Sequence, residues 1–501
     1  MATQPMDNPS RPENELFSPR MKPNTPGKVN YGRTFLIGLA FLSSQTAWAY
    51  YNFMMPIVLR EFLQDAQFYW LGTDTFVGLI MILDNVVAIL MLPYFGVLSD
   101  HTKSKHGRRM PYIMIGCTFG AIAFSIIPQV KVLGLLFAVI TFFNLSMAFY
   151  RSCSISLMPD LTDPKVRSTG NAIIQIMGGL SFILGMLGPI IMELFYDTSI
   201  PEGRTAARTG GFYYISIIML IALVILYTTI KETPTGTKFL QVSNNNMSVD
   251  PTTLEFLGEI EDKKVTQHKK MDYLKLLFKS KDKSIIFLLM AIFASAFGFN
   301  AIETYYSSYA TVFLGWSDAM ASTALIMAPV SLFVFAVPAG KISDRLGRKR
   351  SFMIGLVGLS VCVEILHYTQ SFEESAFIVS MIVIFCLGLF YALISVNAIV
   401  MVWQMAPDGQ IGTYSGAYYL FTQTAAILSP VVMGLEFDLY IALYPENIAI
   451  FGEGYQYRML FFFVLIWQIF AIILMFGVKK ESESKKLDKE KIQEMQEKYA
   501  D

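Results

Sequence analysis

The chain has 501 residues, of which 54% are hydrophobic and only 16% are charged. Soluble globular chains carry about 25% charged residues, so this composition excludes a soluble enzyme. Lysine plus arginine and aspartate plus glutamate number 39 each. The resulting zero net charge argues against a nucleic-acid partner, which would need a basic surplus.

Long apolar runs follow one another along most of the chain. Each has about 20 residues or more, enough to cross a hydrocarbon core of ~30 Å as a helix. The predicted fold class is therefore an all-α membrane protein with twelve transmembrane helices. We expect these spans at 34–58, 75–98, 111–128, 132–157, 170–195, 211–230, 284–313, 319–341, 352–370, 375–403, 414–441 and 459–478.

A polar segment at 231–283 divides the twelve spans into six and six. Part of it, 271–279, has the pattern of a short amphipathic helix at a membrane surface. The predicted domains are a disordered N-terminal arm at 1–33, an N-terminal half at 34–230, this central loop, a C-terminal half at 284–478 and a charged tail at 479–501.

The basic residues of the short loops predict the orientation, because loops rich in lysine and arginine stay in the cytoplasm. With the N-terminus inside, the inner loops hold ten lysines and arginines. The outer loops hold only Arg60, Lys131, Arg204 and Arg208, with Arg458 at a border. We therefore expect both termini in the cytoplasm, in a plasma or bacterial inner membrane.

Two loop motifs occur at matching places in the two halves. A Gly-x-x-x-Asp segment followed by Gly-Arg comes after the second span, at 96–109, and again after the eighth, at 340–348. A Pro-Asp pair follows span four at 159–160 and span ten at 407–408. Two matched halves in the same orientation indicate a parallel-repeat transporter, which binds its substrate near the bilayer midplane where the halves meet.

The repeated loop motif resembles the signature of the major facilitator superfamily, and the resemblance covers all twelve spans. The segment 99–111 resembles that of the sucrose-transporter branch and of the related glycoside–pentoside–hexuronide/cation symporters. The segments at 150–172, 300–303 and 412–419 resemble bacterial members of the sucrose-transporter-like branch. The resemblance implies the major facilitator fold and cation-coupled uptake of a glycoside by alternating access.

The resemblance also implies a gating role for the repeated loops. In the family these charges hold the two halves together on the inner face, and breaking them opens the inner gate. The alternative, that the arginines only set the topology, does not explain the aspartates at fixed spacing. The gating residues are then Gly96, Asp100, Gly107, Arg108 and Arg109 in the first half and Gly340, Asp344, Arg345, Gly347 and Arg348 in the second.

Ionisable side chains at membrane depth are functional candidates, because each costs at least about 2.5–3.5 kcal/mol there. Asp84 on span two and Glu303 on span seven are the proton-coupling candidates, since burial disfavours the charged form of a carboxyl group. Melibiose-type symporters bind their cation with two aspartates on span two, but Ala88 and Leu92 stand at those positions here. We therefore expect H⁺ rather than Na⁺ coupling. For Asp84, a structural hydrogen bond to a neighbouring span is the alternative.

Sugars are bound by planar polar groups and by aromatic faces, and the spans that line the cavity in the family supply both. The substrate-binding candidates are Gln45, Trp48, Tyr51 and Asn52 on span one, Asn85 on span two, Asn144 and Arg151 on span four, Asn300 on span seven, Asn397 and Gln404 on span ten, and Tyr418, Tyr419 and Gln423 on span eleven. Alternatively, the asparagines and glutamines could hold neighbouring membrane helices together through hydrogen bonds. The aromatic residues near span ends could instead belong to the belt of tryptophan and tyrosine at the membrane–water interface.

The predicted function is secondary active transport by proton-coupled symport of a glycoside, such as sucrose or another disaccharide. A facilitator or exporter of another small solute is the alternative, and a non-transporting membrane sensor is a third possibility. Four histidines without HExxH spacing indicate no metal site, and the lack of a Walker motif excludes ATP-driven pumping within this chain. We expect no cofactor, and a monomer whose partners are the sugar, the cation and the bilayer.

Overall fold

The computed structural model describes residues 30–64, 72–100, 102, 104–162, 167–232, 283–406 and 411–479, and every regular element in these ranges is a helix. The predicted arm up to residue 29, the tail from residue 480 and the central loop over 233–282, with its amphipathic segment, lie outside the described residues.

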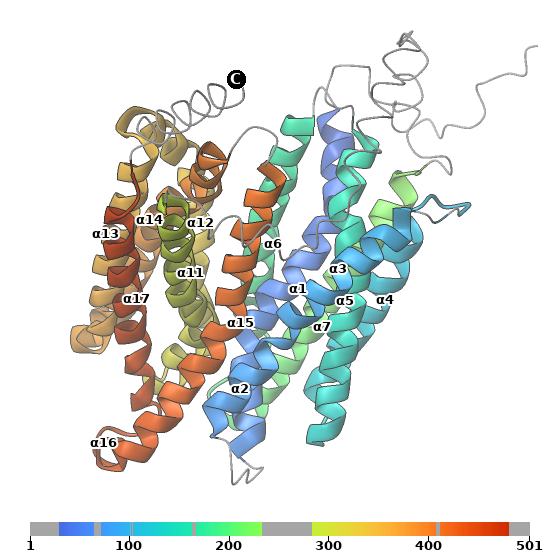
Figure 1. Ribbon diagram of the computed structural model, residues 1–501. Coiled ribbons are helices and arrows are strands. Elements are labelled where there is room, and N and C mark those ends of the chain that lie inside the picture. The colour runs from blue at the N-terminus through green and yellow to red at the C-terminus, as the bar shows by residue number, and fades with distance from the viewer. Residues whose placement is uncertain are drawn as a thin grey trace, which may run out of the picture.

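The first half of the chain forms six spans, coloured blue to green in Figure 1. The second span is broken into two helices, α2 and α3, and a 3-10 turn at Ile127–Gln129 follows α4. The helices are α1 (Tyr31–Gln64), α2 (Thr73–Met81), α3 (Leu83–Asp100), α4 (Met110–Ile126), α5 (Leu133–Leu161), α6 (Arg167–Glu193) and α7 (Pro201–Thr229).

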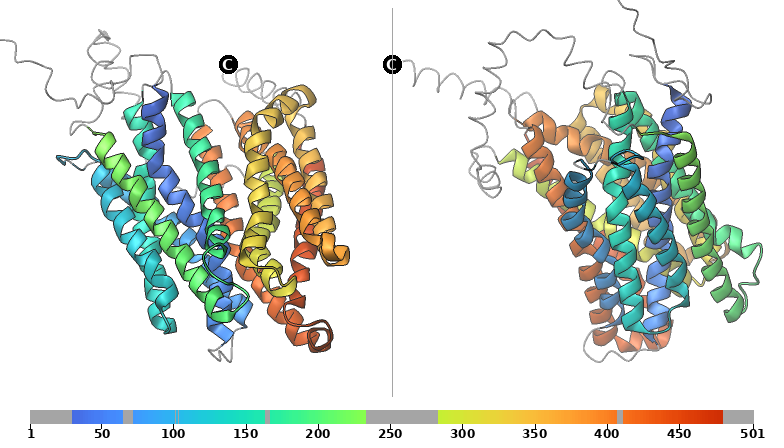
Figure 2. Two further views of the ribbon diagram at one scale, coloured as in Figure 1. Left: turned by 180° about the vertical axis from the view of Figure 1, so that it is seen from behind. Right: turned by 90° about the vertical axis from the view of Figure 1, so that its right-hand side faces the viewer.

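The second half forms six further spans, coloured yellow to red, and lies beside the first half in the left view of Figure 2. A π turn at Tyr309–Phe313 extends α11, and 3-10 turns at Thr369–Ser375 and Tyr455–Arg458 precede α14 and α17. The helices are α11 (Ser284–Ser308), α12 (Asp318–Leu346), α13 (Arg348–His367), α14 (Ala376–Met405), α15 (Ile411–Leu443), the short α16 (Pro445–Phe451) and α17 (Met459–Phe476).

The helices have the length and surface of membrane spans. Within the described residues, eleven spans are long and apolar enough to cross a bilayer, and α1, with 34 residues, is also long enough. Large side chains such as Ile217, Ile382 and Ile473 point outward, as lipid contact allows. The prediction of twelve transmembrane helices is confirmed.

The predicted and observed helix ends differ most at α7. The apolar run predicts a start at 211, whereas the helix begins at Pro201. Proline suits the first position of a helix, since its missing N–H would have no partner there. The first turns of α7 are polar and carry Glu202 and Arg204, so hydropathy alone could not include them.

The two ends of the helix bundle differ in how the halves meet. We call the end where α1 begins and α17 ends, at the top of Figure 1, the terminal face, and the other end the opposite face. The halves touch through α1 and α11, α2 and α15, and α6 and α12, and α15 packs far more closely along α2 than along α3. In the described parts of the chain, the hydrogen bonds and ion pairs between the halves lie at mid-depth or at the opposite face.

Candidate functional site

A polar cavity of about 260 Å³ lies between the two halves, midway along α1 and α11. Nine of the fifteen residues predicted for coupling or substrate binding line it. The first half supplies Gln45, Trp48 and Asn52 from α1, Asp84 and Asn85 from α3, and Arg151 from α5, and the second half supplies Asn300 and Glu303 from α11 and Gln423 from α15. Met81, Phe182, Thr304 and Pro430 are among the lining residues that the sequence did not single out.

The two carboxylates of the cavity are each bound by an amide. Asn52 Nδ2 donates to Glu303 Oε1 at 3.1 Å, and this hydrogen bond joins the two halves. Asn85 Nδ2 donates to Asp84 Oδ1 at 2.9 Å. Asp84 lies in the first turn of α3, directly after the break at Ile82, where the helix dipole favours a negative charge. Among the described residues, neither carboxylate forms a hydrogen bond with a lysine or arginine.

Arg151 brings a positive charge to the same cavity. Its guanidinium carbon lies 5.9 Å from the centre of the Trp48 ring, within cation–π range. Arg151 and Asp84 both line the cavity. Among the described residues, however, Arg151 forms no ion pair within 4 Å, either with Asp84 or with another acid. The guanidinium is thus available to a solute.

Several buried polar atoms of the first-half wall have no hydrogen-bond partner within the described chain. They include Gln45 Oε1, Trp48 Nε1 and Arg151 Nε. On the second-half wall, by contrast, Asn300 Nδ2 donates to the carbonyl oxygen of Ala296 at 2.7 Å. A buried donor or acceptor without a partner costs about 1–3 kcal/mol. A solute or water that pairs with the first-half atoms would recover this cost.

Two predicted binding residues pack outside the lining, next to the cavity wall. Tyr51 is fully buried and lies between Trp48 and Phe143, with ring centres 5.5 Å and 5.6 Å away. Asn144 is also buried, at 1% exposure. Tyr51 therefore supports the tryptophan of the wall rather than facing the cavity.

The predicted residues of spans ten and eleven, other than Gln423, are not brought to the cavity. Asn397 Nδ2 donates to Ser343 Oγ and to the carbonyl oxygen of Leu393, both at 2.7 Å, which ties α14 to α12. Gln404, Tyr418 and Tyr419 also lie outside the lining, and Tyr419 is 56% exposed. A substrate role for these residues stays a prediction without support from the cavity.

The repeated loops lie at the terminal face, where their ion pairs stay within each half. Asp160 binds Arg108 at 2.7 Å and Arg109 at 2.9 Å, and Arg109 also binds Asp100. In the second half, Asp344 lies 3.7 Å from Arg348. The predicted gating role, in which these charges link the halves, therefore stays a prediction for another conformation.

Two glycines of these loops have a backbone that other residues rarely adopt. Gly107 has a φ of 100° and Gly347 a φ of 89°. At Gly107, an added Cβ would also lie 2.4 Å from the side chain of Glu232. Gly96 contributes its carbonyl oxygen, which accepts from Arg109 at 3.3 Å. Gly340 and Arg345 lie in the last turns of α12.

Glu232, just after α7, binds the start of α4 and was not predicted. Its carboxylate accepts from the backbone N–H groups of Arg109, at 2.9 Å, and Met110, at 3.0 Å. These N–H groups have no partner inside α4, so Glu232 caps the helix. Burial raises the pKa of this carboxyl group, although the hydrogen bonds from the backbone N–H groups lower it in part.

A second polar network, at the opposite face, was also missed. It contains Arg60 and Asp74, whose side chains pair at 3.0 Å, and Arg208 and Asp318, which pair at 2.6 Å across the halves. The sequence did carry a signal, because Arg60 and Arg208 are exceptions to the expected concentration of basic residues in inner loops. A buried arginine needs a carboxylate partner, so these exceptions could have pointed to the network.

Twelve membrane helices in two halves around a polar cavity are the architecture of a solute transporter. The chain belongs to the Major Facilitator Superfamily, whose sequence profile matches residues 37–430 and 333–497. The protein is therefore a multi-pass integral membrane transporter of a small molecule, not an enzyme, as the sequence predicts.

Two characterised relatives match part of the chain. The cis,cis-muconate transport protein of Acinetobacter baylyi is 25% identical over 174 residues, which is 34% of this chain and 41% of that protein. The isoprimeverose transporter of Lactiplantibacillus pentosus is 25% identical over 166 residues, or 31% of this chain and 33% of that protein. The chain thus matches less than half the length of each relative.

Solved structures match nearly the whole chain in fold. The D-xylose–proton symporter aligns with a TM-score of 0.60 and 14% identity, covering 91% of this chain and 98% of that one. A bacterial homologue of the human lysosomal transporter Spinster aligns with a TM-score of 0.63 and 13% identity, covering 91% of this chain and 99% of that one. At these identities the likeness concerns the fold alone.

Proposed function

We propose that the protein is a proton-coupled symporter of a glycoside, such as sucrose or another disaccharide. The observation that carries this proposal is the central cavity, which combines two carboxylates, one arginine and one tryptophan between the halves. The repeated loop motif and its resemblance to the sucrose-transporter-like branch support the same substrate class.

The first-half wall supplies the groups that would hold the sugar. Gln45, Trp48 and Arg151 each present a polar atom without a partner in the described chain, and sugar hydroxyl groups can both donate to and accept from such atoms. The ring of Trp48 offers an apolar face, as sugar C–H groups require. The relative named as an isoprimeverose transporter adds support for a glycoside.

Glu303 and Asp84 are the groups that would carry the proton. Each lies in the cavity next to an amide donor, and neither has a basic residue as its hydrogen-bond partner in the described chain. A carboxyl group in such a place takes up a proton when the cavity faces a proton-rich solution and releases it on the other side. On span two, Ala88 and Leu92 stand where melibiose-type symporters carry the two aspartates that bind their cation. Their absence favours coupling to H⁺ rather than to Na⁺.

The terminal face is, in this proposal, the cytoplasmic face of a plasma or bacterial inner membrane. The excess of basic residues in the loops of this face supports the assignment. The halves are joined by polar contacts at the opposite face, so the structure would represent a conformation closed to the outside. The protein would work as a monomer, because each chain contains a whole cavity.

The test is uptake of labelled sucrose into proteoliposomes, with and without an imposed inside-alkaline pH gradient. We expect accumulation that needs the gradient and collapses with a protonophore, and protein-free liposomes are the control. If neither condition gives uptake, sucrose is not the substrate, and isoprimeverose and other disaccharides should be tested in the same assay. Gradient-independent equilibration would instead indicate a facilitator.

A small carboxylic acid is the second candidate substrate. Arg151 lacks an ion pair within 4 Å in the described chain and could bind a carboxylate. One relative is named as a cis,cis-muconate transport protein. Uptake of labelled muconate but of no glycoside would favour this candidate.

A further inference from the structure

The backbones of the two halves come very close where α2 crosses α15 at the opposite face. A Cβ added to Gly78 would lie 2.4 Å from the carbonyl oxygen of Pro430, and one added to Gly434 would lie 2.4 Å from that of Asp74. Real Cβ atoms do not approach so closely, so only glycine fits at both positions. Glycine on both helices brings the backbones, and the polar groups near them, into direct contact.

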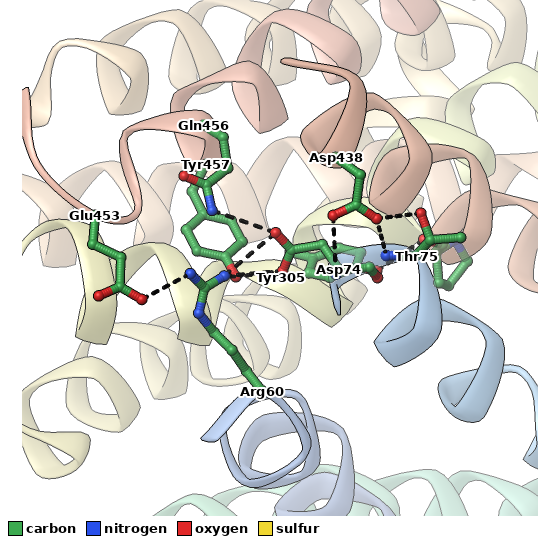
Figure 3. A network of polar contacts seen from close by, with 9 residues as sticks. Arg60, Asp74, Thr75, Tyr305, Asp438, Glu453, Gln456 and Tyr457 are labelled. Carbon is green, nitrogen blue, oxygen red and sulfur yellow. Dashed lines mark hydrogen bonds and ion pairs between the residues drawn. The ribbon is translucent and has the colours of Figure 1, made fainter. Parts of the chain in front are cut away.

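The N-terminus of α2 is capped by a carboxylate of the other half. The N-cap residue, Gly72, has no side chain to satisfy the first N–H groups of this helix. Asp438 of α15 does so instead: it accepts from the backbone N–H groups of Thr75, at 2.8 Å, and Asp74, at 3.3 Å, and from the Thr75 hydroxyl. Figure 3 shows its carboxylate pointing at the start of α2. A negative charge at this position is also favoured by the helix dipole.

Asp74, the second carboxylate of this contact, receives hydrogen bonds from the second half. Its side chain is buried and paired with Arg60 at 3.0 Å. Tyr457 donates to Oδ1 at 2.7 Å and Gln456 to Oδ2 at 3.3 Å (Figure 3). The hydroxyl of Tyr305 donates to the backbone carbonyl oxygen of Asp74 at 2.9 Å. Separating the halves removes all three donors from a buried, charged residue.

The other charged groups at this place add to the contact. Arg60 also reaches Glu453 of the second half at 3.2 Å, so its charge is shared between the halves. Further along the same face, Arg208 pairs with Asp318 across the halves and with Glu61 within the first half. In the described part of this interface, however, only Asp438 accepts from the backbone N–H groups of a helix N-terminus across the halves, and its loss leaves α2 without that cap.

We propose that Asp74 and Asp438 form a latch that holds α2 against α15 and sets how often the transporter opens at the opposite face. This role concerns the balance between conformations, and it holds for any substrate. Loss of either carboxylate leaves the central cavity unchanged but removes charge-assisted hydrogen bonds that exist only when this face is closed. The variants should therefore favour the conformation that is open at this face.

The experiment measures the distance between the halves in the full chain, in lipid nanodiscs without substrate. Spin labels are placed on cysteines at Val132 and Ile450, which are exposed at the opposite face at 64% and 71%, one in each half. The four native cysteines, three of them buried, are replaced by alanine in this background. Double electron–electron resonance then reports the closed and open populations as a short and a long distance.

In the protein with both aspartates intact, we expect mainly the short distance between the two spin labels. Asp438→Asn and Asp74→Asn should each raise the long-distance population by roughly tenfold, as expected for hydrogen bonds to a charged group. Thr75→Val keeps both carboxylates and should raise it less, which provides a test if an aspartate variant fails to fold. Glu202→Gln, an exposed acid at the same face, is the matched control and should change nothing.

Distance distributions that match the unsubstituted protein in Asp438→Asn, Asp74→Asn and Thr75→Val would overturn the latch. Because no substrate is present, this result is independent of the proposed glycoside transport. A failure of sucrose uptake leaves the latch intact, and a failure of the latch leaves the substrate assignment intact.

Discussion

At the scale of single residues, Glu303 connects proton binding to the contact between the halves. Its carboxylate accepts a hydrogen bond from Asn52, which belongs to the other half. A change in the charge of Glu303 therefore changes the strength of a bond that must break when the halves move apart. Asp84 has its amide partner in the same half, so it offers no such direct link.

The first prediction is that Glu303→Gln abolishes pH-driven accumulation. Glutamine keeps an acceptor for Asn52 but cannot bind or release a proton. Accumulation in proteoliposomes should fall to the level without a pH gradient, while exchange of internal for external substrate continues. Glu202→Gln serves as the control. If both Glu303→Gln and Asp84→Asn keep full accumulation, neither acid is the proton site.

The second prediction concerns the pH dependence of stability through Glu232. Burial raises the pKa of this carboxyl group in the folded protein. As the pH rises from 4.5 toward the raised pKa of the folded protein, Glu232 loses its proton in the unfolded chain before it does so in the folded one. The free energy of unfolding therefore decreases over this pH range. Glu232→Gln cannot titrate, and its melting temperature relative to the unsubstituted protein should therefore increase with pH. A difference that is constant across the pH range contradicts the prediction.

Helical spacing explains why part of the site could be predicted from the sequence. Gln45, Trp48 and Asn52 share one face of a helix, and all three line the cavity. Tyr51 and Asn397 are polar residues on the same kinds of span, yet they pack against neighbouring helices. Which polar face meets the cavity depends on how the helices are rotated in the bundle, and a single span does not encode this.

At the scale of elements, the second span shows what the hydropathy pattern could not reveal. One apolar run predicts one helix at 75–98, but the helix is interrupted at Ile82, which divides it into α2 and α3. Neither glycine nor proline stands at this position, so no residue type marks the break. The break allows α2 to follow α15 at the opposite face while α3 carries Asp84 to the cavity.

The third prediction concerns the loop between α3 and α4. Asp100 is half exposed, with 49% of its side chain accessible, and exposed ion pairs contribute little to stability. Asp100→Asn should therefore impair transport while surface expression stays near normal. Asp160 binds both Arg108 and Arg109, so Asp160→Asn should lower the expression level as well. Intact transport in Asp100→Asn would refute the gating role of this loop.

At the scale of the whole molecule, the internal repeat predicted two halves around a central site, but it could not predict how the halves are joined here. A transporter sequence must be compatible with more than one arrangement of its halves. The repeated loops are the recognisable motif, and in this arrangement their charges pair within each half. The contacts that join the halves come instead from acids and arginines near span ends, such as Arg208 and Asp318, where no motif distinguishes them.

The last prediction tests whether transport requires the halves to separate at the opposite face. Ser317 of the second half donates to Glu193 of the first at 3.4 Å, between the start of α12 and the end of α6. In the cysteine-free background, a Glu193→Cys and Ser317→Cys pair should be joined by a short bifunctional thiol reagent that is cleavable by reduction. Uptake should stop on cross-linking and return on reduction, because a bond at this point prevents the cavity from opening outward. Each single-cysteine variant, treated in the same way, is the control for lost side chains and for the reagent, and uptake that continues in the fully cross-linked pair would contradict alternating access through this face.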